Sequence, residues 1–191
     1  STMGEQSVSQ DMSDEDLRSF TSALLEDVHA LQKMLDDNLI ETGVRRIGVE
    51  QEMFIVDKFY RPAPLAVELL ERMKHPQFTT ELGRFNLECN SNPYVYDANC
   101  LSKLEKELRR MYRTAMKAAE EVGAKVALTG ILPTLEKTDL GLDNMVPMPR
   151  YYALNRAMIK MSGGEFKTHI KGLDELNMSH DNVMLEACNT S

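Results

Sequence analysis

Two short segments combine the alternation of a β-strand with several carboxylates, and they constrain the fold more than any other feature of the chain. Residues 48–56 read GVEQEMFIV, and residues 81–90 read ELGRFNLECN. Side chains alternate between the two faces of a strand. In the first segment Glu50, Glu52 and Phe54 therefore share one face. Each segment is predicted to be a strand that places carboxylates among apolar residues.

The second segment places Glu88 on the same face as Asn86 and Asn90. Glutamate is a poor strand former, and residues that break a local preference often mark function. Where two acidic faces meet, three or four carboxylates converge, and they repel one another unless protons or divalent cations neutralise them. Oxygen-only ligands favour Mg²⁺ or Mn²⁺, and the sequence has no CxxC or HExxH pattern for zinc. The predicted metal ligands are Glu50, Glu52, Glu81 and Glu88.

Composition excludes several classes of protein. A chain of 191 residues with 42% hydrophobic residues can form one ordinary domain, and a net charge of −8 argues against a dedicated nucleic-acid binder. No apolar run is long enough for a membrane span, and no signal-peptide pattern opens the chain. Three cysteines without a close pair indicate a reducing compartment. We therefore expect a cytoplasmic protein without nucleic-acid or membrane partners.

Hydrophobic periodicity predicts the elements. Apolar residues at three- and four-residue steps predict helices at 14–38 and 101–122, with shorter helices ending near 74 and spanning 151–161. Further strands are predicted at 125–132, 166–171 and 182–190. Because the strand candidates alternate, we predict an α+β fold: a mostly antiparallel sheet with an acidic open face and helices packed on the other face.

The predicted organisation has three parts: a disordered tail (1–12), an amphipathic helix (13–43) and a catalytic-type domain (44–191). The helix is long enough to dimerise or to dock on a partner, and packing on its own domain is the alternative. A homo-oligomer is therefore one possible state. The strand-like run that stops at Ser191 predicts that the domain is truncated at its C-terminus.

Two arginines and two histidines are further candidates. Arg84 lies between Glu81 and Glu88, where it either neutralises a carboxylate or binds a substrate carboxylate or phosphate. Arg150 opens a predicted helix, which suits an anion site, although a surface arginine beside core tyrosines is the alternative. His169 and His180 fall near the last strands, where they could face a substrate.

Phosphate-loop signatures are absent from the sequence, so a nucleotide would be held another way, for example through metal ions.

Several of these features occur in a known family. The GVEQE strand with Phe54, the carboxylates Glu81 and Glu88, the run LTGILP at 128–133, the Arg150–Tyr151 pair and the terminal EACNTS carry the likeness. From about Arg45 onward the chain resembles the N-terminal part of glutamate–cysteine ligase family 2, carboxylate–amine ligases related to the glutamine synthetase superfamily. The long first helix lies outside this resemblance.

The resemblance implies an incomplete glutamine synthetase-like fold and ATP-dependent joining of a carboxylate, typically the γ-carboxylate of glutamate, to an amine through an acyl phosphate. Glu50, Glu52 and Glu88 would hold Mg²⁺ against the ATP phosphates, with Glu81 as a further ligand. The predicted catalytic residues are Arg84 and Arg150. The small-molecule partners would be an amino acid, an amine and ATP.

Two other functions stay open at this level. One is a phosphohydrolase that uses the same carboxylates and metal with water as the acceptor. The other is a non-catalytic binding or regulatory module with a ligase-like fold. A ligase requires an amine and forms ADP, whereas the hydrolase releases phosphate from a phosphoester without any amine.

Overall fold

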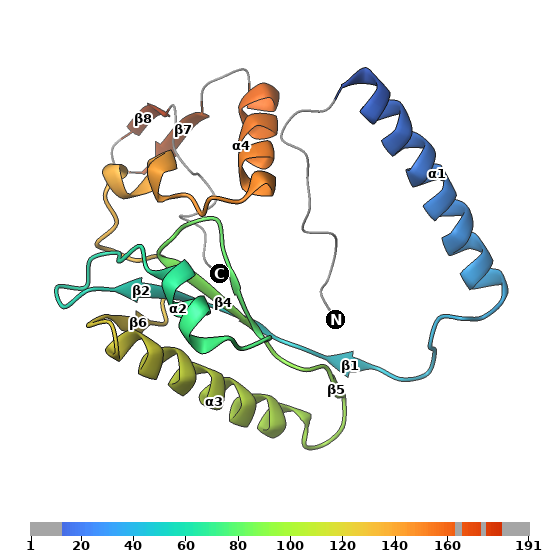
Figure 1. Cartoon of the computed structure of the whole chain (residues 1–191), viewed down its shortest axis with the longest axis horizontal. Helices are drawn as coiled ribbons and strands as arrows, with labels where there is room; N and C mark the ends of the chain where they lie inside the picture. The colour runs from blue at the N-terminus through green and yellow to red at the C-terminus, as the bar shows by residue number, and fades with distance from the viewer. Residues whose placement is uncertain (1–12, 163–165, 173–174, 181–191) are drawn as a thin grey trace.

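A four-stranded antiparallel sheet forms the centre of the molecule (Figure 1). The computed structural model describes residues 13–162, 166–172 and 175–180. The strand order is β3 (Phe78–Thr80), β4 (Asn86–Asn90), β2 (Glu50–Val56) and β6 (Lys125–Ala127). Neighbouring strands all pair in the antiparallel sense. The predicted α+β class is confirmed.

Two helices cover one face of this sheet. They are α2 (Ala66–Met73) and α3 (Cys100–Glu120), close to their predicted ranges. Met53 and Ile55 of β2 pack with Leu87 of β4 against buried side chains of these helices, such as Leu69 and Met111. The alternation of β2 and β4 sends their apolar residues to this side, so the helix-covered face agrees with the prediction.

The other face is covered at one end only. Phe54, Val56 and Phe85 form a second core with residues of the segment 132–148 and with Tyr151 of helix α4 (Pro149–Ser162). This segment contains two short 3₁₀ helices, η1 (Lys137–Leu140) and η2 (Leu142–Asn144). As a result, all four residues 53–56 are fully buried, on both faces of the sheet. The rest of this face carries the acidic residues.

Two predicted strands differ from those observed. The segment 81–90 is not one strand: Glu81 follows β3, residues 82–85 turn, and only residues 86–90 form β4. Within the turn, Gly83 pairs with Met145, and the Arg84 amide donates to the Asn144 carbonyl, which draws the chain away from a regular ladder. Strand β6 ends at Ala127 rather than at residue 132, and Leu128 is exposed.

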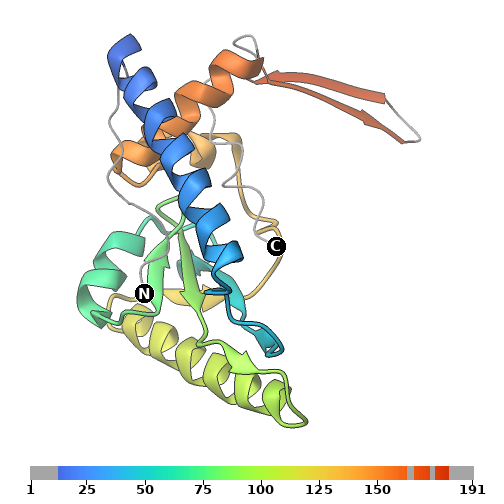
Figure 2. The ribbon, with the colours of Figure 1, turned by 90° about the vertical axis from the view of Figure 1, so that its right-hand side faces the viewer.

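The remaining elements lie outside the central sheet. Strand β1 (Arg46–Ile47) pairs with β5 (Tyr94–Val95), and neither was predicted. Strand β7 (Phe166–Lys171), which was predicted, pairs with β8 (Glu175–His180), and this hairpin projects from the body (Figure 2). The strand predicted at 182–190 and the tail 1–12 lie outside the described residues.

Helix α1 (Asp14–Asp36) forms where the periodicity predicted it. Ser13 and Asp16 make the reciprocal side-chain and backbone hydrogen bonds of a capping box, and three acidic residues in the first turn favour the helix dipole. None of its residues is buried. Among the described residues, no helix combines the length and the apolar content that crossing a membrane requires.

Candidate metal site on the sheet

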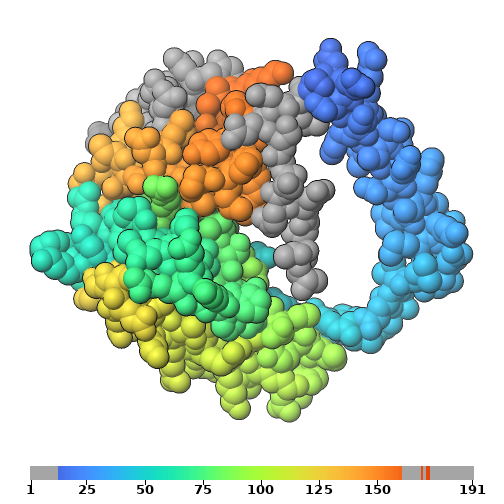
Figure 3. Space-filling model, in the orientation of Figure 1, coloured from blue at the N-terminus to red at the C-terminus, as the bar shows by residue number. Residues whose placement is uncertain are grey.

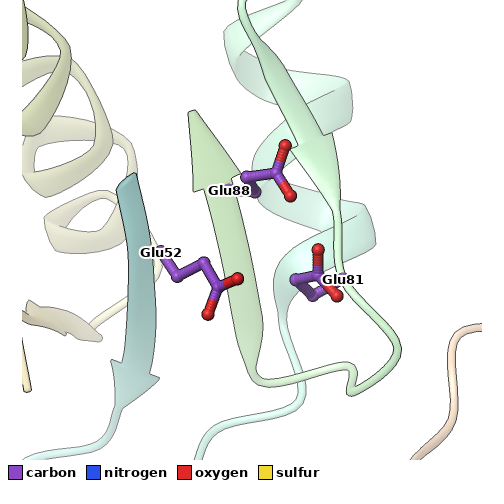
Figure 4. A group of neighbouring side chains, drawn as sticks. All are labelled: Glu52, Glu81 and Glu88. Carbon is purple, nitrogen blue, oxygen red and sulfur yellow. The ribbon is translucent and has the colours of Figure 1, made fainter. Parts of the chain in front are cut away.

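Three carboxylates meet on the partly covered face of the sheet. Oxygen atoms of Glu52, Glu81 and Glu88 all lie within 4.8 Å of one another, and each residue is half-buried. Figure 4 shows the three side chains projecting from β2, from β4 and from the residue after β3 into one space. We refer to these three residues as the acidic group.

Strand register brings the acidic group together. Glu52 lies directly opposite Glu88 in the β2–β4 pair, and Thr79 lies opposite Glu88 in the β3–β4 pair. Glu81 comes two residues after Thr79, so alternation keeps it on the face of Glu88. Carboxylates from β2, from β4 and from the residue after β3 are thereby placed side by side.

Side-chain burial on this face changes from one row to the next, where a row is a pair of residues that lie opposite each other in β2 and β4. The row formed by Phe54 and Asn86 is covered by the second core, with 0% and 1% exposure. The next row, Glu52 opposite Glu88, is half-buried. In the row after that, Glu50 is exposed opposite Asn90. The acidic group therefore lies at the boundary between the apolar core and the solvent.

This position explains the electrostatics of Glu81. Partial burial, followed by a hydrogen bond and charge repulsion from Glu88 and repulsion from Glu52, raises the pKa of Glu81 to about 8. Glu88 also accepts a hydrogen bond from the Asn90 side-chain amide. The group thus holds a proton near neutral pH in the absence of another positive charge, as expected when three carboxylates share a small volume.

The raised pKa of Glu81 predicts how stability depends on pH. Since the folded state holds this proton more tightly than the unfolded state, its contribution is complete below about pH 4.5 and is lost as the pH rises to about 8. We expect the free energy of unfolding of the metal-free chain to fall over this window by on the order of 1–2 kcal/mol. This decrease in free energy is smaller than the full shift in the pKa of Glu81 implies, because solvent screens a partly exposed group. Urea unfolding at a series of pH values measures the decrease.

Glu81→Gln is the matched variant for this experiment. It keeps the shape of the side chain and removes the titrating group, so the decrease between about pH 4.5 and pH 8 should disappear. A decrease that persists unchanged in Glu81→Gln would assign the pH dependence to another group.

The donor set fits a hard divalent cation. The acidic group offers only oxygen atoms, which Mg²⁺ and Mn²⁺ prefer. One row deeper on the same face, the Asn86 side-chain oxygen is buried without a hydrogen-bond partner. Sequence reasoning placed Asn86 on this face but gave it no role, and its burial depends on the covering segment 132–148. The residues present therefore fit a cation site, while the role of each as a ligand stays a prediction.

The structure brings together only some of the predicted site residues. Glu50, which alternation placed on the same face, lies at the exposed end of β2 and is not a member of the acidic group. Arg84 lies in the turn before β4 with its Nε atom buried and without a hydrogen bond. Among the described residues it forms no ion pair with Glu81 or Glu88, so its proposed neutralising role is not seen. His169 is exposed on β7, and His180 ends β8.

Arg150 is linked through a tyrosine to the backbone of the residue that precedes Glu81. Its guanidinium lies over the Tyr151 ring, 4.5 Å from the centroid, and donates to the Tyr151 hydroxyl at 2.6 Å. That hydroxyl donates to the carbonyl of Thr80, the residue before Glu81, at 3.0 Å. Pro149 suits the first position of α4 because it lacks an amide hydrogen that would need a partner. The sequence placed Arg150 at this helix start but did not indicate the link through Tyr151.

Comparison with known proteins decides the family. Residues 46–186 match the family described as glutamate–cysteine ligase family 2, or GCS2. The chain belongs to this family. The match confirms the resemblance seen in the sequence. It contains the acidic group, Arg84 and Arg150, and it excludes α1.

Two curated relatives in the comparison are each named as a candidate glutamate–cysteine ligase 2-3. The protein from Rhodococcus jostii is 33% identical over 96 residues, which make up 50% of this chain and 12% of that protein. The protein from Frankia alni is 35% identical over 91 residues, 47% of this chain and 10% of that protein. The GCS2 chain thus spans only a small part of these relatives. No solved structure matches it, so the glutamine synthetase-like fold stays a prediction.

Proposed function

We propose that this GCS2 chain carries the metal- and phosphate-handling half of an ATP-dependent carboxylate–amine ligase. The activity would join a carboxylate such as the γ-carboxylate of glutamate to an amine, through an acyl phosphate. The observation that carries the proposal is the acidic group, three carboxylates within 4.8 Å of one another inside the segment that matches the family.

The acidic group suits phosphoryl transfer. Such reactions depend on positioning and on neutralising phosphate charge more than on covalent chemistry by the protein. A bound Mg²⁺ or Mn²⁺ would supply that neutralisation, and Glu52, Glu81 and Glu88 are the residues that would hold it. The proton that Glu81 retains near neutral pH would leave as the cation binds, so metal affinity should rise with pH.

The proposed role of Arg150 follows from its position. Its guanidinium is fixed by Tyr151, and within the described part of the chain it forms no ion pair. A positive group held in this way, through Tyr151 and the backbone next to Glu81, is suited to bind an anion, either a phosphate or the substrate carboxylate. Arg84 would serve the same purpose from the turn before β4. Both assignments are part of the proposal.

Two measurements test the proposal. Calorimetric titration of the chain with Mn²⁺ should show binding that strengthens when a non-hydrolysable ATP analogue is present. Together with the other half of the ligase, the chain should form ADP from ATP and Mg²⁺ only when glutamate and an amine, drawn from a panel of amino acids and simple amines, are both present. Release of phosphate from a phosphoester without any amine would instead identify a phosphohydrolase.

A further inference from the structure

Helix α1 presents an apolar surface that nothing else in the described chain covers. Eight of its apolar residues are 42–58% exposed, and we call them the α1 stripe: Leu17, Phe20, Leu24, Leu25, Val28, Leu31, Met34 and Leu35. Open space separates α1 from the body of the domain over most of its length (Figure 3). Because isolated helices are marginally stable in water, a helix with such a stripe needs a surface to pack against.

The stripe has the heptad spacing of a coiled coil. Leu17, Leu24 and Leu31 recur every seven residues and occupy d positions. Asp14, Thr21, Val28 and Leu35 then occupy the a positions, three or four residues away from a leucine at d. Leucine at d with β-branched residues at a favours two parallel strands. The sequence of α1 is thus suited to pair with an identical helix.

Besides Asp14 at the exposed start of the helix, the a and d positions, which form the seam, contain one polar residue, and its hydroxyl is already hydrogen-bonded. The Thr21 hydroxyl donates to the Leu17 carbonyl of its own helix at 2.8 Å. Pairing would therefore bury no hydroxyl without a partner, and only the threonine methyl group would face the second helix. A threonine at an a position is consequently compatible with a buried seam.

The flanking positions also suit a parallel pair. In that arrangement each g residue lies near the e residue five positions later in the other helix. Phe20 would meet Leu25, and Asp27 would meet Gln32, so these flanks bring apolar side chains together without opposing like charges. The face away from the seam is polar and carries Glu15, Ser19, Glu26, His29, Lys33 and Asp36.

We propose that α1 pairs with the α1 of a second copy of this chain in a parallel two-stranded coiled coil. The helix of 23 residues is about 34 Å long, and the apolar seam from Leu17 to Leu35 occupies most of that length. The seam lies outside the segment that matches the family, so it adds an assembly function to the domain. This inference is independent of the proposed ligase activity.

Sedimentation analysis of the full chain over a dilution series tests the pairing. The unmodified chain should be a dimer, and Leu24→Glu with Leu31→Glu should make it a monomer. Ala23→Glu with Ala30→Glu is the matched control, because it adds the same charges on the opposite face and should leave the dimer intact. Since α1 buries no residue in the domain, the monomer should keep the thermal midpoint of the sheet domain. A monomeric unmodified chain, or a dimer that survives the leucine substitutions, would overturn the proposal.

A cysteine substitution tests the orientation. In a parallel coiled coil Thr21 faces its own counterpart, so Thr21→Cys in a Cys188→Ser background should form a covalent dimer under mild oxidation. Ser22→Cys, one residue away and off the seam, should form little. Equal cross-linking of the two variants, or none for Thr21→Cys, would contradict the parallel arrangement.

Discussion

Glutamine in place of Glu52 or Glu88 is expected to weaken Mn²⁺ binding by at least about 100-fold, because each change removes a charged ligand and not merely a supporting group. In the complete ligase the same substitutions should abolish the metal-dependent formation of ADP. Glutamine keeps the shape of glutamate and removes repulsion within the acidic group, so the metal-free variants should be at least as stable as the unmodified chain. Calorimetric titration with Mn²⁺ and urea unfolding measure the two effects.

Glu50→Gln is the sharpest control for this experiment. Glu50 has the same chemistry as Glu52, lies two residues away on the same strand and shares its face, but it is exposed and outside the acidic group. Replacement of Glu50 should change Mn²⁺ affinity much less than replacement of Glu52 does. Equal losses from the two variants would mean that the bound metal lies further along β2 than the structure places it. Unfolding of Glu88→Gln would make this carboxylate a structural partner.

The contrast between Glu50 and Glu52 shows how far sequence reasoning reaches. Alternation correctly placed both residues on one face of the first strand, and it placed Glu88 on the polar face of the second. It could not assign the register between the strands, which pairs Glu52 with Glu88 and leaves Glu50 opposite Asn90. Register is fixed by the turns and by both cores, which involve residues remote in the sequence.

The second core is the other feature that periodicity could not supply. Residues 53–56 form a continuous apolar run, whereas a strand with one open face alternates. The run reflects coverage of both faces by α2 and α3 on one side and by residues 132–148 on the other. The covering segment itself has little regular structure, so its sequence gives no periodic signal. In contrast, α1 and α3 were predicted well because their apolar stripes recur over more than five turns.

The largest loss of stability is expected at Glu107, which connects α3 to the ends of the central strands. This carboxylate is 5% exposed and accepts hydrogen bonds from the Gln77 side chain at 2.8 Å and from the Asn92 side chain at 2.7 Å. The Asn92 backbone amide donates to its other oxygen, and Tyr94 also hydrogen-bonds to it. Glu107→Ala would leave the Asn92 and Tyr94 donors without this acceptor and would leave the Gln77 amide only the Asn90 carbonyl, at a cost of about 3 kcal/mol. Urea unfolding measures this loss.

Glu105→Ala is the matched control on the same helix. Glu105 forms an exposed ion pair with Arg109, one helical turn away, and such pairs contribute about 0.3–0.5 kcal/mol. Similar losses from the Glu105 and Glu107 variants would contradict a special role for the buried carboxylate. The comparison separates the loss of a buried acceptor from the general effect of shortening a glutamate on α3.

The response to acid gives an independent test of the same network. Burial acts to raise the pKa of Glu107, but the hydrogen bonds from Gln77, Tyr94 and Asn92 outweigh it, so the net shift is downward. A lowered pKa means that the stabilising contribution is complete above about pH 4.5 and is lost as the pH falls further. Unfolding measured between pH 6 and pH 3 should therefore show a steeper decrease for the unmodified chain than for Glu107→Ala. The network holds Asn92, which lies two residues beyond Asn90, and the Asn90 side chain donates a hydrogen bond to Glu88. Protonation of Glu107 in acid should therefore also disturb the acidic group.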